Sequence, residues 1–242
     1  MKPHELLRAG KLNEAIQATG AEVREHPTDI RLRTFLFELL CFAGEYDRAA
    51  KHLNVLAQAS TDAETGALLY RSALAAERKR QLFFESGQYA RTRVESAPVR
   101  GTLNGQPFES LEDADPRIGA RLEIFVAGEY VWLPLAHVSS LKIEAPRLLR
   151  DLLWATGRIM AGPAAHGQEF GEVILPALCP LSWKHTAEVV RLGRATEWET
   201  ADGLETPAGQ KLLLMNGEEV IPFLEVRELI IEGPSTQPPA ST

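Results

Sequence analysis

The stretch IFVAGEYVWLPLAHVSSLKIE, from Ile124 to Glu144, recurs 88 positions later as LLLMNGEEVIPFLEVRELIIE, from Leu212 to Glu232. Each copy reads as a strand, a tight turn, a second strand, a proline and a further apolar segment. The turns contain Ala-Gly and Asn-Gly, residue types that accept the positive φ angles of a hairpin. Because internal repeats set an architecture, the two copies predict one duplicated β-rich region.

An ungapped overlay of the copies aligns turn, apolar and proline positions. The pairs are Ile124 with Leu212, Val126 with Leu214, Gly128 with Asn216, Leu133 with Ile221, Pro134 with Pro222, Val138 with Val226, Leu141 with Leu229 and Ile143 with Ile231. A looser, gapped match upstream joins Val99–Gly101 to Val190–Gly193 and Asp113–Asp115 to Ala201–Gly203. The duplication indicates a scaffold more than it indicates chemistry.

Further strands are predicted around the copies. Asn104-Gly105 predicts a hairpin between Val99–Leu103 and Gln106–Phe108. Other expected strands are Arg121–Val126, Arg158–Met160, Gly171–Leu175 and Val189–Leu192, with one short helix at Leu148–Trp154. Short, regularly spaced strands are typical of a small barrel or of two packed sheets, and the sequence leaves both open for residues 98–234.

The first 95 residues carry a different repeat. AGKLNEAI and AGEYDRAA lie 34 positions apart, which matches Gly10 to Gly44 and Ala15 to Ala49. This is the period of the tetratricopeptide repeat, a helix-turn-helix unit, and Pro27 stands where that repeat ends its second helix. We therefore expect about five helices forming a TPR-like α-α superhelix, and an α+β protein of two domains, 1–95 and 98–234.

The last predicted helix carries an apolar set and a basic run. Its apolar set is Leu68, Leu69, Ala73, Ala76 and Leu82, and the run Arg78–Arg80 is interpreted as a solvated helix face. Helical repeats of this kind bind peptides or helices of other proteins. The alternative is that the repeats only pack against the next domain; we favour protein binding.

Composition excludes several classes of protein. The net charge is −7, with 14 Lys and Arg against 13 Asp and Glu up to Ala97, and 12 against 20 after it. The acidic remainder disfavours a nucleic-acid surface there. No apolar run reaches membrane-spanning length, and the N-terminus has no secretory apolar segment, so we expect a cytoplasmic protein without a membrane partner. Cys41 and Cys179 are interpreted as reduced, buried thiols.

Signatures of catalysis and cofactor binding are missing. The six histidines form no metal-binding pair, and there is no GxSxG elbow, phosphate-binding loop or GxGxxG turn. We predict no catalytic residue, no cofactor and no metal. The competing hypothesis is an enzyme that uses Asp113, Asp115 and Asp151 as acid or base. Turn formation explains the first two better, and an ion pair with Arg150 explains the third.

Three tryptophans could anchor either a core or an interface. Trp132 and Trp154 are interpreted as core anchors, whereas for Trp198, in a polar setting, both roles stay open. The polar, proline-containing segment 235–242 is expected to be a disordered tail.

Six short stretches, taken together, resemble one known family: Val99–Gly105, Asp113–Gly119, Tyr130–Pro134, Leu149–Trp154, Leu175–Pro180 and Leu192–Trp198. The chain resembles the ImpE/SciE-type accessory proteins of bacterial type VI secretion, also called TagJ, over nearly its whole length. It departs from them at Cys179, where the family usually has a tyrosine.

The resemblance implies a cytoplasmic, non-enzymatic adaptor. Such an adaptor contacts the small subunit of the contractile sheath through a helix near that subunit's N-terminus, and is associated with the AAA+ unfoldase ATPase that recycles the sheath. Candidate protein-binding residues, from the segments between the two β copies, are Arg150, Asp151, Trp154, Arg194 and Trp198. A structural homo-oligomer is a third hypothesis, and the oligomeric state stays open.

Overall fold

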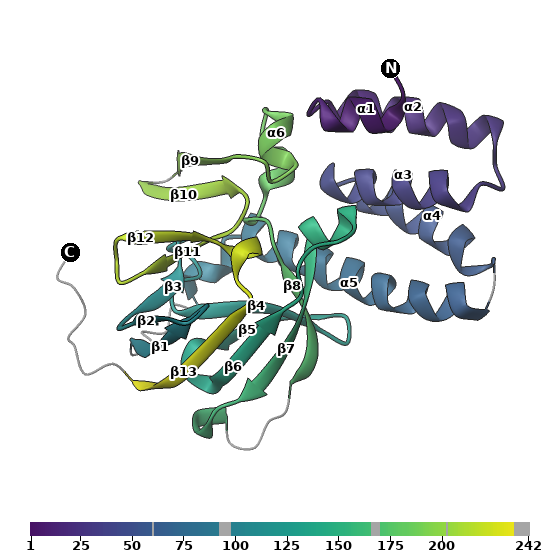
Figure 1. Cartoon of the computed structure of the whole chain (residues 1–242). Coiled ribbons are helices and arrows are strands. Elements are labelled where there is room, and N and C mark those ends of the chain that lie inside the picture. Colours follow the sequence, from purple (N-terminus) through teal and green to yellow (C-terminus); the bar gives the residue numbers. More distant parts are fainter. Residues whose placement is uncertain (60, 92–97, 166–169, 202, 235–242) are drawn as a thin grey trace.

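The computed structural model describes residues 1–59, 61–91, 98–165, 170–201 and 203–234. A layered set of helices is followed by antiparallel sheets, so the α+β fold class is confirmed (Figure 1). The predicted tail from residue 235 lies outside the described residues. Among those residues, no helix is both long and apolar enough to cross a bilayer.

The helical layer confirms the 34-residue period. Five α-helices precede the first strand in the described chain: α1 Pro3–Arg8, α2 Leu12–Glu25, α3 Ile30–Phe42, α4 Tyr46–Ala57 and α5 Thr61–Glu85, followed by the 3₁₀ turn η1 Gln88–Arg91. Gly10 and Gly44 turn the chain with φ angles of 78° and 72°, which glycine adopts without steric cost. Ala15 and Ala49 are fully buried, where only a small side chain permits close helix contact.

The predicted apolar face of α5 is wrong in part. Leu68, Leu69 and Leu82 are 62%, 50% and 63% exposed. The buried face instead carries Ala73 and Ala76, followed by charged residues. The reason is tertiary: α5 packs against α4 on one side and against the sheet on another, and small residues allow both contacts.

The strands form three antiparallel sheets. They are β1 Val99–Leu103, β2 Gln106–Phe108, β3 Leu111–Asp113, β4 Arg121–Val126, β5 Glu129–Pro134, β6 Val138–Ile143, β7 Trp154–Ala161, β8 Gly171–Pro176, β9 Thr196–Ala201, β10 Leu204–Gly209, β11 Leu212–Met215, β12 Glu219–Pro222 and β13 Glu228–Pro234. The orders are β2-β1-β13-β6-β7-β8-β4-β5, β12-β11-β3 and β10-β9. The hairpin predicted at Asn104-Gly105 has the predicted bounds.

The duplication is visible in the pairing of the central strands. The 3₁₀ turn η2 Leu135–His137 leads into β6, and η6 Phe223–Glu225 leads into β13, at the predicted spacing of 88. Strands β6 and β13 pair antiparallel with Leu141 opposite Leu229, its own equivalent. The two copies therefore face each other across an approximate two-fold axis at this pair.

The symmetry extends one strand further on each side. Strand β7 pairs with β6 as β1 pairs with β13, which places Gly157 opposite Ile143 and Gly101 opposite Ile231. Neither glycine has room for a Cβ atom: at Gly101 it would lie 1.9 Å from the carbonyl oxygen of Ile230. Strand β1 precedes both copies in the chain, yet it belongs structurally with the second.

Two parts of the predicted repeat alignment are wrong. Pro134 lies opposite Arg121, but Pro222 lies opposite Leu212, so the spacing of 88 fails before the turns. The upstream match fails as well, because residues 188–191 form a short helix, α6, and not the strand predicted at 189–192. Backbone bonds from Arg191 to Ala187 and from Leu192 to Glu188 close a helical turn here, against the strand propensity of Val189 and Val190.

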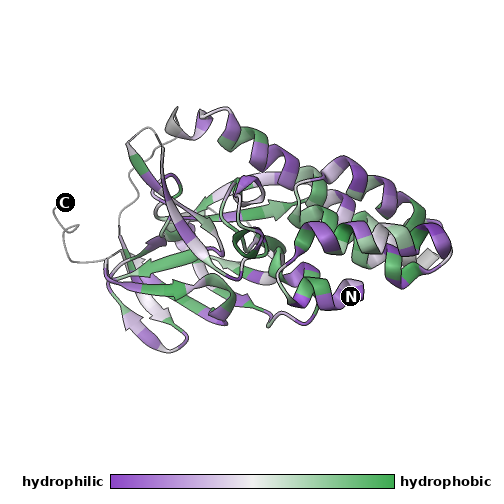
Figure 2. Cartoon of the chain, turned by 90° about the horizontal axis from the view of Figure 1, so that it is seen from above, coloured by the Kyte–Doolittle hydropathy of each residue, from purple (hydrophilic) through white to green (hydrophobic). Residues whose placement is uncertain are grey.

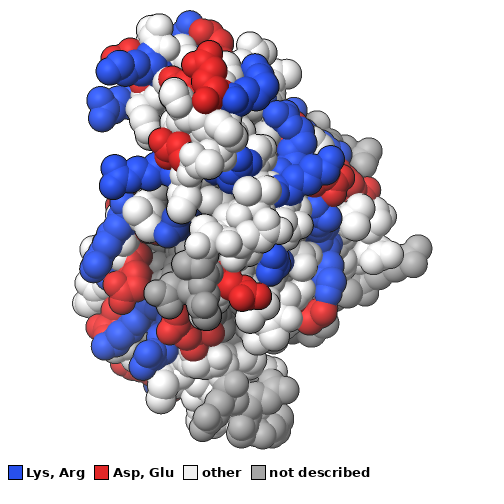
Figure 3. Space-filling model, turned by 90° about the vertical axis from the view of Figure 1, so that its right-hand side faces the viewer, with Lys and Arg blue, Asp and Glu red and all other residues white. Residues whose placement is uncertain are grey.

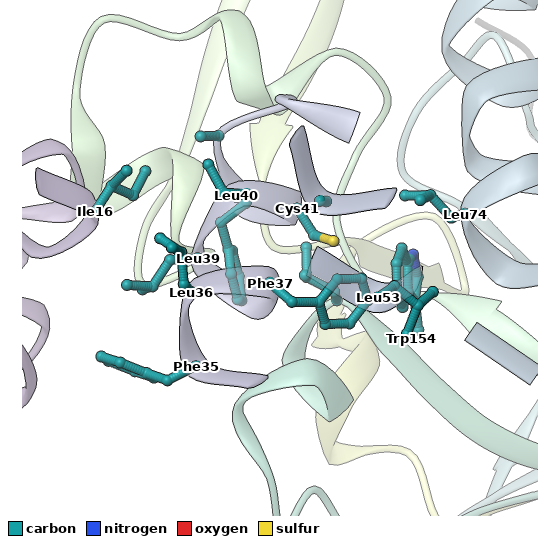
Figure 4. Packing of buried hydrophobic residues seen from close by; sticks show 14 of the residues in the cluster. Ile16, Phe35, Leu36, Phe37, Leu39, Leu40, Cys41, Leu53, Leu74 and Trp154 are labelled. Carbon is teal, nitrogen blue, oxygen red and sulfur yellow. The ribbon is translucent and has the colours of Figure 1, made fainter. Parts of the chain in front are cut away.

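Two apolar clusters make up the core. One fills the space between the two larger sheets. The other lies among the helices and takes in residues from the β-rich region: Phe125, Leu153, Trp154, Leu178 and Leu192. Figure 2 shows the hydrophobic positions gathered in the sheets and on the inner sides of the helices, and Figure 4 shows Trp154 among the side chains of α3, α4 and α5. The core is therefore continuous across the predicted domain boundary.

The predicted helix near residue 150 is the 3₁₀ turn η3 Leu149–Leu152, and Trp154 begins β7.

Candidate functional site

Buried charges join α5 to the sheets. The guanidinium of Arg80, whose residue is 1% exposed, donates from Nε and Nη2 to the two carboxylate oxygens of Glu123 on β4, both at 2.8 Å. It also donates to Glu77 at 3.1 Å and to the carbonyl of Leu178 at 2.8 Å. Bidentate geometry of this kind is the strong form of an arginine–carboxylate contact.

The network continues into the β-rich region. Lys211 Nζ donates to Asp113 at 2.5 Å and to Glu123 at 2.6 Å. Asp115 accepts from Arg117 at 2.6 Å. The buried network therefore holds four carboxylates against three cations: Glu77, Asp113, Asp115 and Glu123 against Arg80, Arg117 and Lys211.

The network holds one more carboxylate than cations, and the pKa values of two of its carboxylates, Asp113 and Glu123, differ accordingly. Burial raises the pKa of Asp113 to about 6, although Lys211 acts in the opposite direction. Burial also disfavours the charged form of Glu123, but Arg80 and Lys211 outweigh it and lower the pKa of Glu123 to about 2. Neutralising one carboxylate balances the charge of the network, which favours proton binding at Asp113.

The network has no room for a substrate. The cavities beside it measure about 10 Å³, lined by Asp113, Glu123 and Lys211 among apolar side chains, and about 20 Å³, lined in part by Arg80 and Cys179. Each holds a water molecule at most. The carboxylates of the competing enzyme hypothesis are thus sealed from substrates, and Asp151 lies elsewhere. This network fastens α5 to the sheets.

The segment between β6 and β7, together with the first residue of β7, holds three of the predicted binding residues. Arg150 donates to Glu38 of α3 at 2.9 Å and lies 4.9 Å from the ring centre of Tyr70 on α5. Trp154 is buried and donates from Nε1 to Glu77 at 3.0 Å. Asp151 instead accepts from the backbone N–H groups of residues 147 and 148 and fixes the turn locally. Arg150 and Trp154 thus connect the helices to the β-rich region.

The other two predicted residues lie elsewhere. Arg194 donates to the carbonyl of Arg8 at 2.9 Å, beside α6 Glu188–Arg191, and so contacts the C-terminal end of α1. Trp198 is 45% exposed and lies opposite Pro207 in the β9–β10 hairpin. The five predicted residues therefore do not form one site.

The sequence analysis did not identify the strongest contacts between α5 and the sheets. Arg80 was assigned to a solvated face and is buried, while Glu77, Glu123 and Lys211 were not singled out. A usable signal existed in their positions: Glu77 and Arg80 continue the face of Ala73 and Ala76 at helical spacing. Charged residues at core positions of a helix require partners from another element.

An open hollow lies along the same face of α5 as the network, nearer the N-terminus of that helix. Its volume is about 150 Å³, and it separates α5 from the tip of the β4–β5 hairpin and from β8. The lining residues are Leu69, Ser72, Ala73, Phe125, Val126, Ala127, Gly128, Thr156, Glu172, Val173 and Ile174. We call this space the α5 hollow.

Comparison with known proteins identifies the family of the chain. A model of the ImpE protein family matches residues 105–230. The type VI secretion system accessory component TagJ of Pseudomonas aeruginosa is 34% identical over 96% of this chain and 92% of its own length. A crystal structure of a Vibrio parahaemolyticus protein superposes with a TM-score of 0.80 at 22% identity, covering 95% of this chain and 97% of that one, which supports the fold. The chain belongs to the ImpE family and is similar to a type VI secretion accessory component.

Proposed function

We propose that the chain is a non-enzymatic, cytoplasmic adaptor that binds the small subunit of the type VI sheath through a helix near that subunit's N-terminus. The proposed contact site is the α5 hollow, at whose edge Leu69 stays half exposed. Membership of the ImpE family and similarity to an accessory component support the assignment to type VI secretion.

The hollow suits the apolar face of a helix. A volume of about 150 Å³ accepts one or two aliphatic side chains, and Leu69, half exposed on α5, supplies an apolar rim. Amphipathic helices bind other proteins by laying such side chains, spaced three or four residues apart, into an apolar groove. Burying each exposed leucine would contribute roughly 1–2 kcal/mol.

The proposal includes the sheath-recycling ATPase as an associated partner. An adaptor that holds a sheath subunit by one helix leaves the rest of that subunit accessible to an unfoldase. The helices and sheets are joined by a buried network, so the whole chain would act as one rigid carrier during this transfer.

Calorimetric titration of the full-length chain with a peptide of the small sheath subunit's N-terminal helix tests the proposal. Leu69→Asp is expected to weaken binding at least about tenfold, since it places a charge at the edge of the hollow. Leu82→Asp is the matched control, because Leu82 is equally exposed on α5 but lies outside the hollow.

Absence of binding to the unaltered chain at about 100 µM peptide would reject the sheath contact. Equal losses in both variants would leave the sheath contact standing and reject the α5 hollow as its location.

A further inference from the structure

The β9–β10 hairpin has a strand edge that no other described strand covers. Figure 1 shows the hairpin at the margin of the molecule, with β9 as its outer strand. Within the described sheets, β9 pairs only with β10. Of the four tryptophans, only Trp198 on β9 is exposed, to 45%. Neither the buried ionic network nor the α5 hollow contains a residue of this hairpin.

Hydrogen bonds at one end of β10 fix the orientation of the backbone in the hairpin. Gly209 donates its N–H to the hydroxyl of Ser182 at 2.8 Å, and its carbonyl accepts from the N–H of Cys179 at 2.8 Å. Both groups of Gly209 therefore point away from β9, and the pair that Gly209 makes with Thr196 has no backbone hydrogen bond. β10 is thereby attached to the body of the molecule, and β9 is the strand with the free edge.

The free edge carries the backbone groups of every second residue of β9. Pairs with and without backbone hydrogen bonds alternate along an antiparallel ladder. Trp198 and Thr200 follow Thr196 at two and four positions, so neither bonds to β10, and their N–H and C=O groups point outward. Pro207, opposite Trp198, agrees with this register because proline has no N–H to donate. An extended segment binds to such an edge by adding a strand.

The other outer strands of the described sheets fit an added strand less well. β2 has three residues with Pro107 at its centre, and β12 has four and ends at Pro222. β3 has three residues, and β5 packs against α5. Proline cannot donate to a neighbouring strand. β9 has six residues and no proline, which sets its edge apart.

The two sides of β9 carry different side chains. The carboxylates of Glu197 and Glu199 both approach Nε2 of His185, to 3.4 and 3.3 Å, so they lie on one side of the hairpin. Trp198 lies on the other side, because successive residues of a strand alternate. The side chains of Glu197 and Glu199 are 55% and 61% exposed, and among the described residues neither pairs with a Lys or an Arg.

The hairpin carries acidic residues and no basic residue. Residues 196–209 contain Glu197, Glu199, Asp202 and Glu205 and no Lys, Arg or His. On the opposite side of the molecule, by contrast, Figure 3 shows Lys and Arg interspersed with Asp and Glu. Carboxylates along an edge oppose pairing with a second copy of the same strand, since like charges would lie opposite each other. The same carboxylates favour a strand of opposite charge.

We propose that the free edge of β9 binds an extended segment of a partner protein in which Lys or Arg alternates with apolar residues. An added strand continues both sides of the hairpin, so its basic side chains would lie beside Glu197 and Glu199 and its apolar side chains beside Trp198. Arginine suits the acidic side best, because its guanidinium donates two parallel hydrogen bonds to a carboxylate. The sheath contact at the α5 hollow uses other residues, so the two proposals are tested independently.

The test is a calorimetric titration of the full-length chain with three short synthetic peptides. The first alternates Arg with Val, the second has Glu in place of each Arg, and the third is the first with a methyl group on every peptide nitrogen. The first peptide should bind at least about tenfold more tightly than either of the others, and its affinity should fall as salt is raised from about 50 to 500 mM. Equal binding of the methylated peptide would show attraction of charge without an added strand and would overturn the proposal, as would no binding of the first peptide at about 500 µM.

Two variants locate the contact. Glu197→Gln with Glu199→Gln removes the charge that attracts arginine and should weaken the first peptide at least about tenfold. Thr200→Pro removes an N–H that points away from β10, so the ladder should persist while strand addition is blocked. The matched control is Glu218→Gln with Glu219→Gln, which makes the same change of charge at exposed positions beside the outer strand β12.

An unchanged affinity in either β9 variant, or an equal loss in the control, would reject the β9 edge. Sedimentation of the chain without peptide gives the remaining outcome. A dimer that Thr200→Pro converts to a monomer would mean that a second copy of the chain occupies the edge, and would overturn the proposal.

Discussion

The two β copies have the same succession of strands and turns, but different elements pack against them. The β4–β5 hairpin of the first copy lies against α5, and Phe83 of α5 packs on Tyr130 and Trp132 with ring centres 5.9 and 5.1 Å apart. On the second copy, 88 residues later, Trp132 corresponds to Val220, which is exposed, and the position 88 residues after Tyr130 is Glu218, an exposed turn residue. The first copy therefore carries aromatic residues that pack against the helical layer, and the second copy lacks them at these positions.

The buried charged residues show the same asymmetry between the two β copies. Glu123 lies on the first hairpin and accepts from Arg80, Lys211 and the hydroxyl of Tyr130. Lys211, which immediately precedes the second hairpin, reaches across to it. The ionic network therefore joins the residues that immediately precede the two copies, Glu123 and Lys211, and it contacts α5 through Glu123 on the first hairpin. The carbonyl of Leu178 and the indole of Trp154 add further contacts with α5.

Cutting the chain at the predicted domain boundary should have the largest effect. Expression of residues 1–95 and 98–234 separately would expose the buried guanidinium of Arg80 on one piece and the carboxylate of Glu123 on the other. We expect neither piece to show the dispersed NMR spectrum and cooperative unfolding of the full chain. If both pieces unfold cooperatively, the two regions are independent domains, as the sequence predicted.

Breaking the ionic contact within the full chain should have the next largest effect. Arg80→Met removes the positive charge and leaves Glu123 with Lys211 and the hydroxyl of Tyr130, which is expected to lower the free energy of unfolding by about 3–5 kcal/mol. Urea denaturation measures it. The second variant, Arg80→Met with Glu123→Gln, should recover part of the loss, since the carboxylate of Glu123 is then no longer buried without Arg80, while Glu77 keeps its hydrogen bonds from Gln81 and Trp154.

Truncation of equivalent side chains should separate the two copies. Trp132→Ala removes contacts with Phe83, Phe84 and the guanidinium of Arg121, 4.3 Å from the ring centre, and should cost about 2–3 kcal/mol. Val220→Ala, at the equivalent exposed position, should cost less than about 0.5 kcal/mol. Similar losses at both positions would show that the covering helix does not distinguish the copies.

Much of this architecture was predictable because its signals are local. The 34-residue period fixed the helical turns at Gly10 and Gly44, and Asn104-Gly105 fixed a hairpin. The buried contact between α5 and the sheets was not predictable in the same way. Arg80 meets Glu123 across 43 positions and Lys211 meets Asp113 across 98, and nothing in the local pattern joins them. Residues 189–192 were missed because the closed helical turn of α6 forms against the strand propensity of its valines.

A pH-dependent effect, at most as large as that of Trp132→Ala, comes from Asp113, which accepts from Lys211 beside the second copy. Folding raises the pKa of Asp113 to about 6 from an ordinary 3.8, so the folded state binds its proton more tightly than the unfolded state does. The stability gained from this proton is present below pH 4 and is lost as pH rises through 6. In Asp113→Asn this loss is absent. Relative to the wild type, the variant should therefore gain up to about 2–3 kcal/mol in free energy of unfolding between pH 4 and pH 7. Glu123, with its pKa lowered to about 2, contributes the opposite slope below pH 4.5 in both proteins and cancels from the difference. Urea titrations at several pH values measure the difference. A difference that does not change with pH would mean that Lys211 keeps Asp113 charged throughout, and that the buried network carries a net negative charge.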